Sequence, residues 1–334
     1  MPHSIRKVFS TGANGFVACH ILSDLIRAGY LVTASVRSKT KSQEILEVHP
    51  EWKDIVKFVY IPDFSVADAF DEAIKQEKGR LDYVIHTASP VTADIVDIQR
   101  ELIDPAVKGT ASLLKSVHEY GGPHFKRFVL LGTASILNCL EDTSVTGDPY
   151  SEKDWDPITP EIAIEKQNPL LGYCAAKTQG EKEAWKFLED TKTSFDMTVL
   201  NPDVIIGPML HNVSKPEKVN ETNKLTIYNF LNGTRTGTEA WELPFYRFVD
   251  VRDVSRAHIL SLNNPATSNQ RVQLVNAHIT PQLVVNIIRK KFPELKSRVP
   301  EGNLSQIVPH GIQMSRWNNG KSYQVFGRIG LTGT

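Results

Sequence analysis

Alternating apolar and polar segments divide the first half of the chain into short strands and amphipathic helices. Runs of five or six residues rich in Val, Ile and aromatic side chains predict strands at 7–11, 31–36, 56–61, 83–87 and 128–132. Apolar residues at helical spacing predict helices at 15–28, 39–48, 67–78 and 98–120. Strands that alternate with helices form parallel sheets through right-handed crossovers. The pattern therefore predicts an α/β protein with a doubly wound Rossmann fold.

The second half of the chain has a less regular pattern. Residues 140–170 carry several prolines, acids and hydroxyls, which favour an ordered excursion over a core element. Further helices are expected at 172–188, 254–262 and 280–291, the last capped by Thr280, and further strands at 197–200, 248–250 and 272–275. Residues 201–208 are expected to form a loop, and residues 321–334 lack a helical pattern.

Composition and charge narrow the classes of partner. The 334 residues include 38 basic and 38 acidic side chains, so the formal net charge is zero and no basic excess favours nucleic acid. No apolar run approaches the length of a membrane span, and the first residues lack the apolar core of a signal peptide. The three cysteines have no Cys-x-x-Cys spacing, which favours a reducing compartment. We therefore expect a cytoplasmic protein.

A glycine loop follows the first predicted strand and opens the first predicted helix. It reads Gly12-x-x-Gly15-x-x-Ala18, in the context that a dinucleotide-binding loop requires. Gly12 makes the tight turn, and Gly15 lets the backbone approach a pyrophosphate at the helix N-terminus. We expect the remaining contacts of this loop with the cofactor to come from Asn14, Phe16 and Val17.

The end of the second predicted strand indicates which dinucleotide is bound. An NAD enzyme usually places an acid there to bind the ribose hydroxyls. This chain instead has Arg37 and Lys41, which can pair with a 2′-phosphate. The cofactor is therefore predicted to be NADPH/NADP+. The alternative is that these basic residues only form a solvated run on a surface helix.

Two further strand ends face the same crevice. Asp63 and Phe64 follow the third strand, where an Asp side chain can bind the adenine amino group or simply shape a turn. The small residues Thr87, Ala88 and Ser89 follow the fourth strand and allow close approach of the backbone to the cofactor. His86 is interpreted as a packed strand residue rather than a catalytic one.

Tyr173 and Lys177 provide the candidate chemistry. They are four residues apart in a predicted helix, so their side chains lie on one face. An ammonium beside a phenol favours the ionised phenol and lowers its pKa. With a dinucleotide loop in the same chain, this pair indicates hydride transfer at a carbonyl group. No metal site is expected.

Five motifs in order resemble the extended short-chain dehydrogenases/reductases. They are the glycine loop, His86-Thr-Ala-Ser-Pro90, Tyr173-Cys-Ala-Ala-Lys177, Asn201-Pro202-x-x-x-x-Gly207-Pro208 and Phe248-Val-Asp-Val-Arg-Asp-Val254. Within that family the chain is similar to fungal NADPH-dependent aldehyde and ketone reductases of the methylglyoxal-reductase type, and less closely to plant dihydroflavonol reductases. The resemblance covers about residues 5–300.

The resemblance implies a catalytic hydroxyl, tyrosine and lysine. Tyr173 would donate its proton to the carbonyl oxygen, and Lys177 would bind the nicotinamide ribose and lower the tyrosine pKa. The hydroxyl is expected from Thr133, with Ser135 as its rival, because Leu131-Gly132-Thr133 stands where the family usually has Thr-Ser-Ser. Ala106 replaces the asparagine that many members use in a proton relay.

The resemblance also implies the substrate pocket and the division of the chain. Pro202 and Val204 would line the nicotinamide, and the expected substrate contacts are Val91, Thr133, Asn138, Leu170 and Val204. The NADP-binding Rossmann domain is predicted at 1–200, with 140–170 reaching toward the substrate and 246–262 returning to the core. Residues 201–334 are predicted to be mainly substrate-binding.

The favoured function is NADPH-dependent reduction of a small aldehyde or ketone by a monomer or homodimer. One alternative is a nucleotide-sugar epimerase or dehydratase on the same fold, against which the missing strand-end acid argues. The other is a non-catalytic NADP-binding regulator, against which the Tyr173–Lys177 pair argues. Fold alone does not separate these functions.

Overall fold

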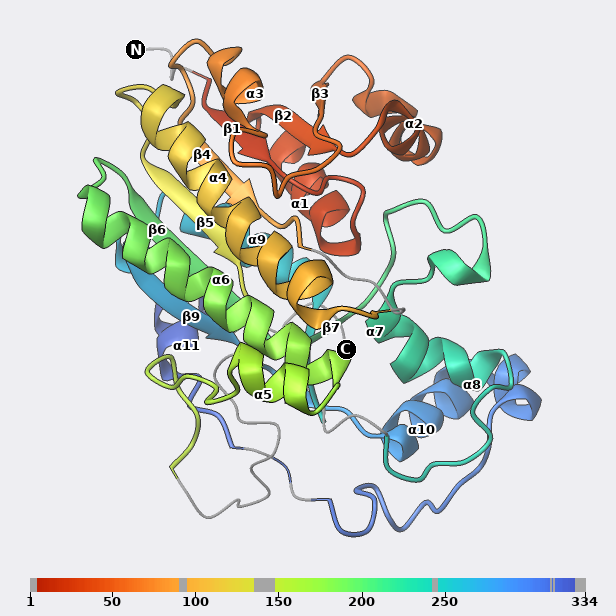
Figure 1. Cartoon of the computed structure of the whole chain (residues 1–334). Helices are drawn as coiled ribbons and strands as arrows, with labels where there is room; N and C mark the ends of the chain where they lie inside the picture. The colour runs from red at the N-terminus through yellow and green to blue at the C-terminus, as the bar shows by residue number, and fades with distance from the viewer. Residues whose placement is uncertain are drawn as a thin grey trace.

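A parallel sheet forms the centre of the molecule. The computed structural model describes residues 5–89, 95–134, 148–241, 246–312, 314 and 316–327. The seven strands of this sheet are β1 (Lys7–Ser10), β2 (Leu31–Val36), β3 (Val56–Tyr60), β4 (Tyr83–His86), β5 (Arg127–Leu131), β6 (Asp196–Pro202) and β9 (Gln270–Leu274). All neighbouring pairs are parallel, in the order β3-β2-β1-β4-β5-β6-β9 (Figure 1). The predicted Rossmann fold is confirmed.

Helices cover both faces of this sheet. They are α1 (Phe16–Arg27), α2 (Lys39–Val48), α3 (Asp71–Lys75), α4 (Asp104–Tyr120), α6 (Pro169–Thr191), α9 (Val251–Ser261) and α11 (Gly320–Phe326). The short helix α5 (Pro160–Glu165) packs on α6. A π-helical turn, η2 (Gln99–Ile103), leads into α4. Helices α4 and α6 lie side by side over one face (Figure 1), and α1 packs against α9.

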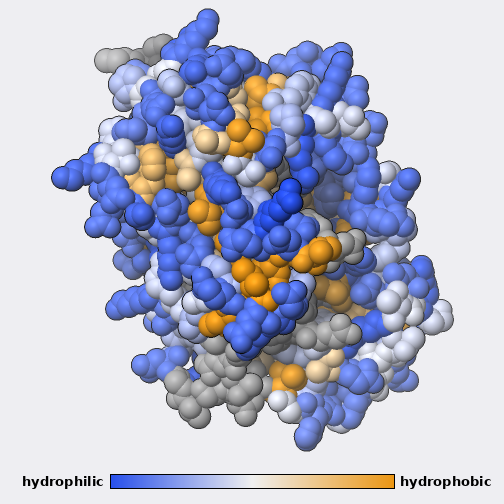
Figure 2. Space-filling model, viewed as in Figure 1, coloured by the Kyte–Doolittle hydropathy of each residue, from blue (hydrophilic) through white to orange (hydrophobic). Residues whose placement is uncertain are grey.

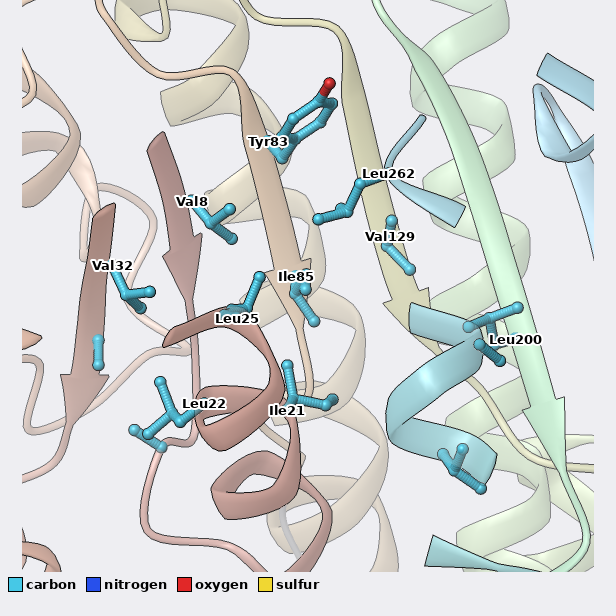
Figure 3. Close-up of a cluster of buried hydrophobic side chains, with 14 of the residues drawn as sticks. Val8, Ile21, Leu22, Leu25, Val32, Tyr83, Ile85, Val129, Leu200 and Leu262 are labelled. Carbon is cyan, nitrogen blue, oxygen red and sulfur yellow. The ribbon is translucent and has the colours of Figure 1, made fainter. Parts of the chain in front are cut away.

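Alternating strand residues supply two separate cores. Val8 belongs to the cluster beneath α1 and α9, whereas the next residue, Phe9, belongs to the cluster beneath α4 and α6. Figure 3 shows Leu22 and Leu25 of α1 directed toward the strand residue Val8. Because helices cover both faces of this parallel sheet, its strands are hydrophobic on both sides and have no polar face.

The order of the strands places the candidate site. The chain runs outward from β1 through β2 to β3, then returns to β4 and continues in the opposite direction. This reversal opens a crevice beyond the carboxyl ends of β1 and β4, where ligands bind in sheets of this kind. The glycine loop and residues 87–89 begin at these two strand ends.

A smaller region lies beyond the main sheet. It contains a second sheet of β7 (Val204–Ile206), β8 (Arg247–Asp250) and β10 (Ala277–His278), with β8 in the middle. The helices α7 (Glu221–Asn223), α8 (Asn229–Leu231) and α10 (Pro281–Lys291) lie together at the lower right of Figure 1. Phe230, Ile279 and Val285 are buried in the separate core of this region. The domain limits given above remain a prediction.

Three elements differ from the sequence-based expectations. Helix α3 is shorter than 67–78 because residues 65–70 are mainly turns. Strand β7 lies inside the expected loop 201–208 and pairs with β8. The absence of a helix after residue 321 was wrongly predicted, since α11 buries Ser322 and Phe326. The expected cap at Thr280 is confirmed, because its side chain accepts the Leu283 N–H.

The surface is mainly hydrophilic on the face seen in Figure 2, with apolar residues gathered near the middle of the molecule. Among the described residues, no helix combines the length and the apolar composition that crossing a bilayer demands.

Candidate functional site

The glycine loop is fitted tightly against the end of β4. Gly12 has a φ of +68°, and a Cβ on it would lie 3.1 Å from both the backbone N and the Cα of Ala88. Any other residue would therefore be strained and would press on backbone atoms that cannot rotate away. The Gly15 N–H donates to the Gly12 carbonyl at 2.9 Å and closes the turn.

A buried polar network holds this loop to the residues after β4. The Thr11 hydroxyl accepts the backbone N–H groups of Thr87 and Ala88, each at 3.1 Å, and lies 2.8 Å from His86 Nδ1. The Thr110 hydroxyl donates to a carbonyl of its own helix, so it accepts from His86 Nε2 at 3.4 Å. Burial lowers the pKa of His86 to about 3. His86 is therefore a neutral structural residue that orients the loop.

The N-terminus of α1 is chemically suited to a pyrophosphate. Gly15 is the N-cap, no side chain caps the first N–H groups, and the first turn holds no acid. The uncapped N–H groups and the positive end of the helix dipole both favour an anion. Phe16 and Val17 form this first turn, and Asn14 lies half-buried just before it. These residues fit a dinucleotide.

Basic side chains gather at the end of β2. Arg37 is exposed, and no carboxylate of the described residues pairs with it. Lys41 pairs with Glu44 at 2.9 Å, and Lys218 pairs with the other oxygen of the same carboxylate at 3.2 Å. Ser38 starts α2 by accepting the Lys41 N–H. The uncompensated charge of Arg37 fits a 2′-phosphate, and Lys218 is a cation that the sequence pattern did not reveal.

Asp63 shapes the turn after β3. Its Oδ1 accepts the Ser65 N–H at 2.9 Å and the Ser65 hydroxyl at 2.6 Å, and these bonds lower the pKa of Asp63. Phe64 packs so closely on α4 that a Cβ on Gly109 would lie 2.2 Å from its ring. The contact of Asp63 with adenine remains a prediction.

Thr133, Tyr173 and Lys177 meet at the carboxyl end of β5. Asn168 caps α6 with its side chain, and Tyr173 and Lys177 follow on one face of that helix. The Tyr173 phenol is hydrogen-bonded to the hydroxyl of Thr133. Thr133 is buried, and its hydroxyl also lies 3.5 Å from the Pro202 carbonyl. The structure thus brings the three expected catalytic residues together.

Burial controls the proton affinities of this group. It raises the pKa of Tyr173 to about 12, and the Thr133 hydrogen bond acts in the opposite direction. It lowers the pKa of Lys177 to about 8, against the pull of Glu181. Burial therefore outweighs the other influences on the phenol here, and Lys177 Nζ donates to the Leu131 carbonyl at 3.0 Å. The lowering of the tyrosine pKa by Lys177 stays a prediction.

The packing around Gly132 explains why the segment Leu131-Gly132-Thr133 has no side chain at its middle position. A Cβ on Gly132 would lie 1.9 Å from Oδ1 of Asn201 and 3.2 Å from a methyl of Val199. Asn201 is fully buried at the end of β6. The side chain of Asn201 therefore occupies the space that a serine at position 132 would need.

The expected substrate residues are only partly within the described chain. Leu170, in the first turn of α6, and Val204, at the start of β7, are half-buried. Val91, Asn138 and the rival hydroxyl Ser135 lie outside the described residues. Ser89, after β4, is half-buried.

Sequence reasoning missed the residues behind Lys177. Glu181 is buried one turn further along α6, and Arg271 of β9 pairs with it at 2.7 Å. An acid four residues after the lysine, on the same helical face, was the available signal. Asp203, next to Pro202, was also missed, and burial raises its pKa to about 7.

The described residues contain no group of three or more His, Cys, Asp and Glu side chains that could hold a metal ion.

Comparison with known proteins identifies the family. The sequence profile of the NAD dependent epimerase/dehydratase family matches residues 8–276. The chain belongs to this family. The resemblance to extended short-chain dehydrogenases/reductases is thereby confirmed.

Individual relatives of the family are similar over nearly the whole chain. The NADPH-dependent methylglyoxal reductase GRE2 of Saccharomyces cerevisiae is 33% identical, over 96% of this chain and 93% of the yeast protein. The ketoreductase azaE of Aspergillus niger is 35% identical, over 96% and 92%. The crystal structure of yeast Gre2 complexed with NADPH superposes with a TM-score of 0.85 and 29% identity, covering 96% of this chain and 93% of that one. The UDP-glucose 4-epimerase of Thermotoga maritima, at 18% identity and a TM-score of 0.67, is similar in fold.

Proposed function

We propose that this protein is an NADPH-dependent reductase that converts a small aldehyde or ketone to the alcohol. The observation that carries the proposal is the hydrogen-bonded Thr133–Tyr173 pair with Lys177 one turn away, at the carboxyl end of a dinucleotide-binding sheet. Relatives named as NADPH-dependent methylglyoxal reductase and ketoreductase support the same reaction.

The three residues divide the work at the carbonyl oxygen. Bound NADPH supplies the hydride. The Thr133 hydroxyl orients the carbonyl oxygen by a hydrogen bond, and Tyr173 transfers its proton to that oxygen. A phenol keeps its proton at neutral pH, which is the state a proton donor needs, and the raised pKa of Tyr173 extends this state to higher pH. Lys177 binds the nicotinamide ribose and stabilises the tyrosinate that forms.

The cofactor is held along the crevice. The loop of Gly12, Asn14 and Gly15 and the first turn of α1 bind the pyrophosphate. Arg37 and Lys41 bind the 2′-phosphate, and Asp63 with Phe64 bounds the adenine. Residues 87–89 lie against the cofactor, and Pro202 with Val204 covers the nicotinamide. Fungal relatives that use NADPH support this choice of dinucleotide.

The substrate lies between the two regions of the molecule. We assign its contacts to Val91, Thr133, Asn138, Leu170 and Val204, mostly apolar side chains that suit a small carbonyl compound. We also propose that the protein is a monomer or homodimer in the cytoplasm. The described cysteines, Cys19 and Cys174, are buried and form no disulfide, which suits a reducing compartment.

A spectrophotometric assay tests the proposal. Purified protein is mixed with NADPH or NADH and a panel of aldehydes, ketones and one nucleotide sugar, and absorbance at 340 nm is followed. We expect NADPH oxidation with at least one carbonyl compound and slower oxidation of NADH. Absence of oxidation with every carbonyl would contradict the reductase, and turnover of the sugar alone would identify an epimerase. Tight NADPH binding without turnover would identify a regulator.

Two variants assign the hydroxyl. Thr133→Val keeps the shape of the side chain but removes its oxygen, and we expect a loss of about 10²-fold in kcat. Ser135→Ala is the matched variant, and we expect it to retain turnover. The opposite pattern would move the role to Ser135.

A further inference from the structure

Four side chains at four-residue intervals form a row along α6: Tyr173, Lys177, Glu181 and Trp185. Residues at this spacing lie one above another on a helix. The Trp185 indole N–H donates to Glu181 Oε1 at 3.0 Å. The α6 row therefore continues the catalytic pair with a carboxylate and an indole that holds it.

Glu181 is buried as an ion pair rather than as an isolated acid. Its side chain is 1% exposed, and Arg271 Nε donates to its Oε1 at 2.7 Å from the edge strand β9. Burial raises the pKa of Glu181, whereas Arg271, Trp185 and Asn201 lower it. Because a guanidinium is permanently charged and this one is itself only 10% exposed, it requires the ionised carboxylate as its partner.

Arg271 is itself immobilised from the outside. Its Nη1 donates to the carbonyls of Glu152 and Asp154 at 2.7 and 2.8 Å, and its guanidinium lies 3.6 Å from the centre of the Trp155 ring. An open groove of about 520 Å³ begins on this outer side, lined by Trp155, Lys182 and Arg271 among others. The groove follows the C-terminal half of α6, away from Thr133 and Tyr173.

A buried ion pair contributes little net stability, because desolvation offsets the attraction. This pair is placed where its charge acts on Lys177, one helical turn away. The Lys177 ammonium donates to the Leu131 carbonyl, and the carboxylate of Glu181 opposes the effect of burial on its proton affinity. Without that carboxylate, burial alone would act on the lysine.

Other charged groups around Lys177 do not replace Glu181. On β4, burial and the charge of Lys177 lower the pKa of His86 to about 3, so it is neutral. On β9, Arg271 carries a positive charge like that of Lys177, and it is paired with Glu181. The charged residues and the histidine of η2, α4 and α5, which pack on α6, are exposed or half-buried: Arg100, Glu101, Asp104, Lys108, Lys115, His118, Glu119, Glu161 and Glu165. Arg127 lies at the opposite end of β5 from Leu131 and pairs with Asp196.

We propose that Glu181 is a positioning residue for the reaction: its buried carboxylate, fixed by Arg271, keeps the Lys177 ammonium charged and directed toward the site beside Tyr173. The inference rests on the proposed carbonyl reduction. The alternative is that the Glu181–Arg271 pair only fastens α6 to β9.

The test compares Glu181→Gln, Arg271→Met and a control, Glu189→Gln, which makes the same chemical change at an exposed position of α6. The value of kcat/KM for the carbonyl substrate is measured from pH 6 to 10 at saturating NADPH. The Kd of NADPH is measured over the same range by fluorescence, and thermal unfolding is recorded for each variant.

We expect Glu181→Gln to move the alkaline limb of kcat/KM, and that of NADPH binding, about one pH unit lower. The sign follows because an uncharged neighbour leaves Lys177 to lose its proton at lower pH. Arg271→Met is expected to shift the limb in the same direction, since an unpaired buried carboxylate takes up a proton. The double variant is expected to shift it no further. Glu189→Gln should match the wild type.

An active Glu181→Gln enzyme with an unmoved alkaline limb would overturn the inference, whatever its melting temperature. Glutamine has the shape of glutamate and keeps an acceptor for Trp185, so this variant decides the matter even if Arg271→Met does not fold. A wild type that oxidises no NADPH would instead contradict the proposed function.

Discussion

Two cations of the site, Arg37 and Lys177, have opposite surroundings. Arg37 stands exposed at the end of β2 with no carboxylate of the described residues beside it. Lys177 is held on α6 by the Leu131 carbonyl, and burial lowers its pKa to about 8. An exposed cation can bind a phosphate without changing its protonation, whereas a buried one can lose its proton near neutral pH. We therefore expect Arg37 to act in recognition of the cofactor and Lys177 to act in the chemical step.

The largest expected effect is at the buried part of the site, where Tyr173 lies beside Lys177. Tyr173→Phe removes the proton donor but preserves the ring, and we expect kcat to fall by about 10³-fold. The Kd of NADPH, measured by fluorescence titration, should change little. A variant that kept more than a tenth of the activity would show that the proton comes from another group.

Substitution of the exposed cation, Arg37, is expected to weaken cofactor binding and to leave turnover nearly unchanged. Arg37→Ala is expected to raise the KM for NADPH by about 10- to 100-fold, as for loss of a charged hydrogen bond, with little change in kcat. The KM for NADH should stay nearly constant, because NADH has no 2′-phosphate. Arg27→Ala, an exposed arginine at the far end of α1, is the control. An unchanged KM for NADPH would remove Arg37 from the cofactor site.

Adding a side chain at position 132 tests how closely Gly132 is packed against Asn201. Gly132→Ser restores the residue that the family usually has, but its Cβ would lie 1.9 Å from Asn201 Oδ1. We expect a loss of about 1–3 kcal/mol in the free energy of unfolding, measured with urea. Adding Asn201→Ala should recover part of that loss, and a strictly additive double variant would contradict the contact.

The smallest expected effect is at Asp63. Its carboxylate already accepts two hydrogen bonds from Ser65. Asp63→Ala is therefore expected to raise the KM for NADPH by only about 2- to 10-fold, the range of one hydrogen bond of ordinary strength. A change as large as that of Arg37→Ala would show that adenine recognition is as important as phosphate recognition.

Local patterns were sufficient to predict the main sheet and the placement of Tyr173 and Lys177 on one helix. The periodicity of residues 7–131 predicted five strands, and the spacing of Tyr173 and Lys177 placed both on one face of α6. Helix α11 was missed because its order comes from burying Ser322 and Phe326 against distant residues. Strand β7 was missed because three residues become a strand only by pairing with β8.

The surroundings of the site depended on contacts that spacing does not reveal. Arg271 reaches Glu181 across 90 positions of the chain, and Asn201 meets Gly132 only when β5 and β6 are paired. The raised pKa of Tyr173 likewise follows from burial, which the Tyr-x-x-x-Lys pattern alone does not contain.

The most direct test of the central claim is a paired measurement of NADPH oxidation at 340 nm with a panel of aldehydes and ketones, using the wild type and Tyr173→Phe at equal cofactor occupancy. We expect the wild type to form one alcohol molecule for each NADPH consumed, and Tyr173→Phe to consume almost no NADPH. Equal rates in the two proteins, or no oxidation by the wild type with any carbonyl compound, would contradict it.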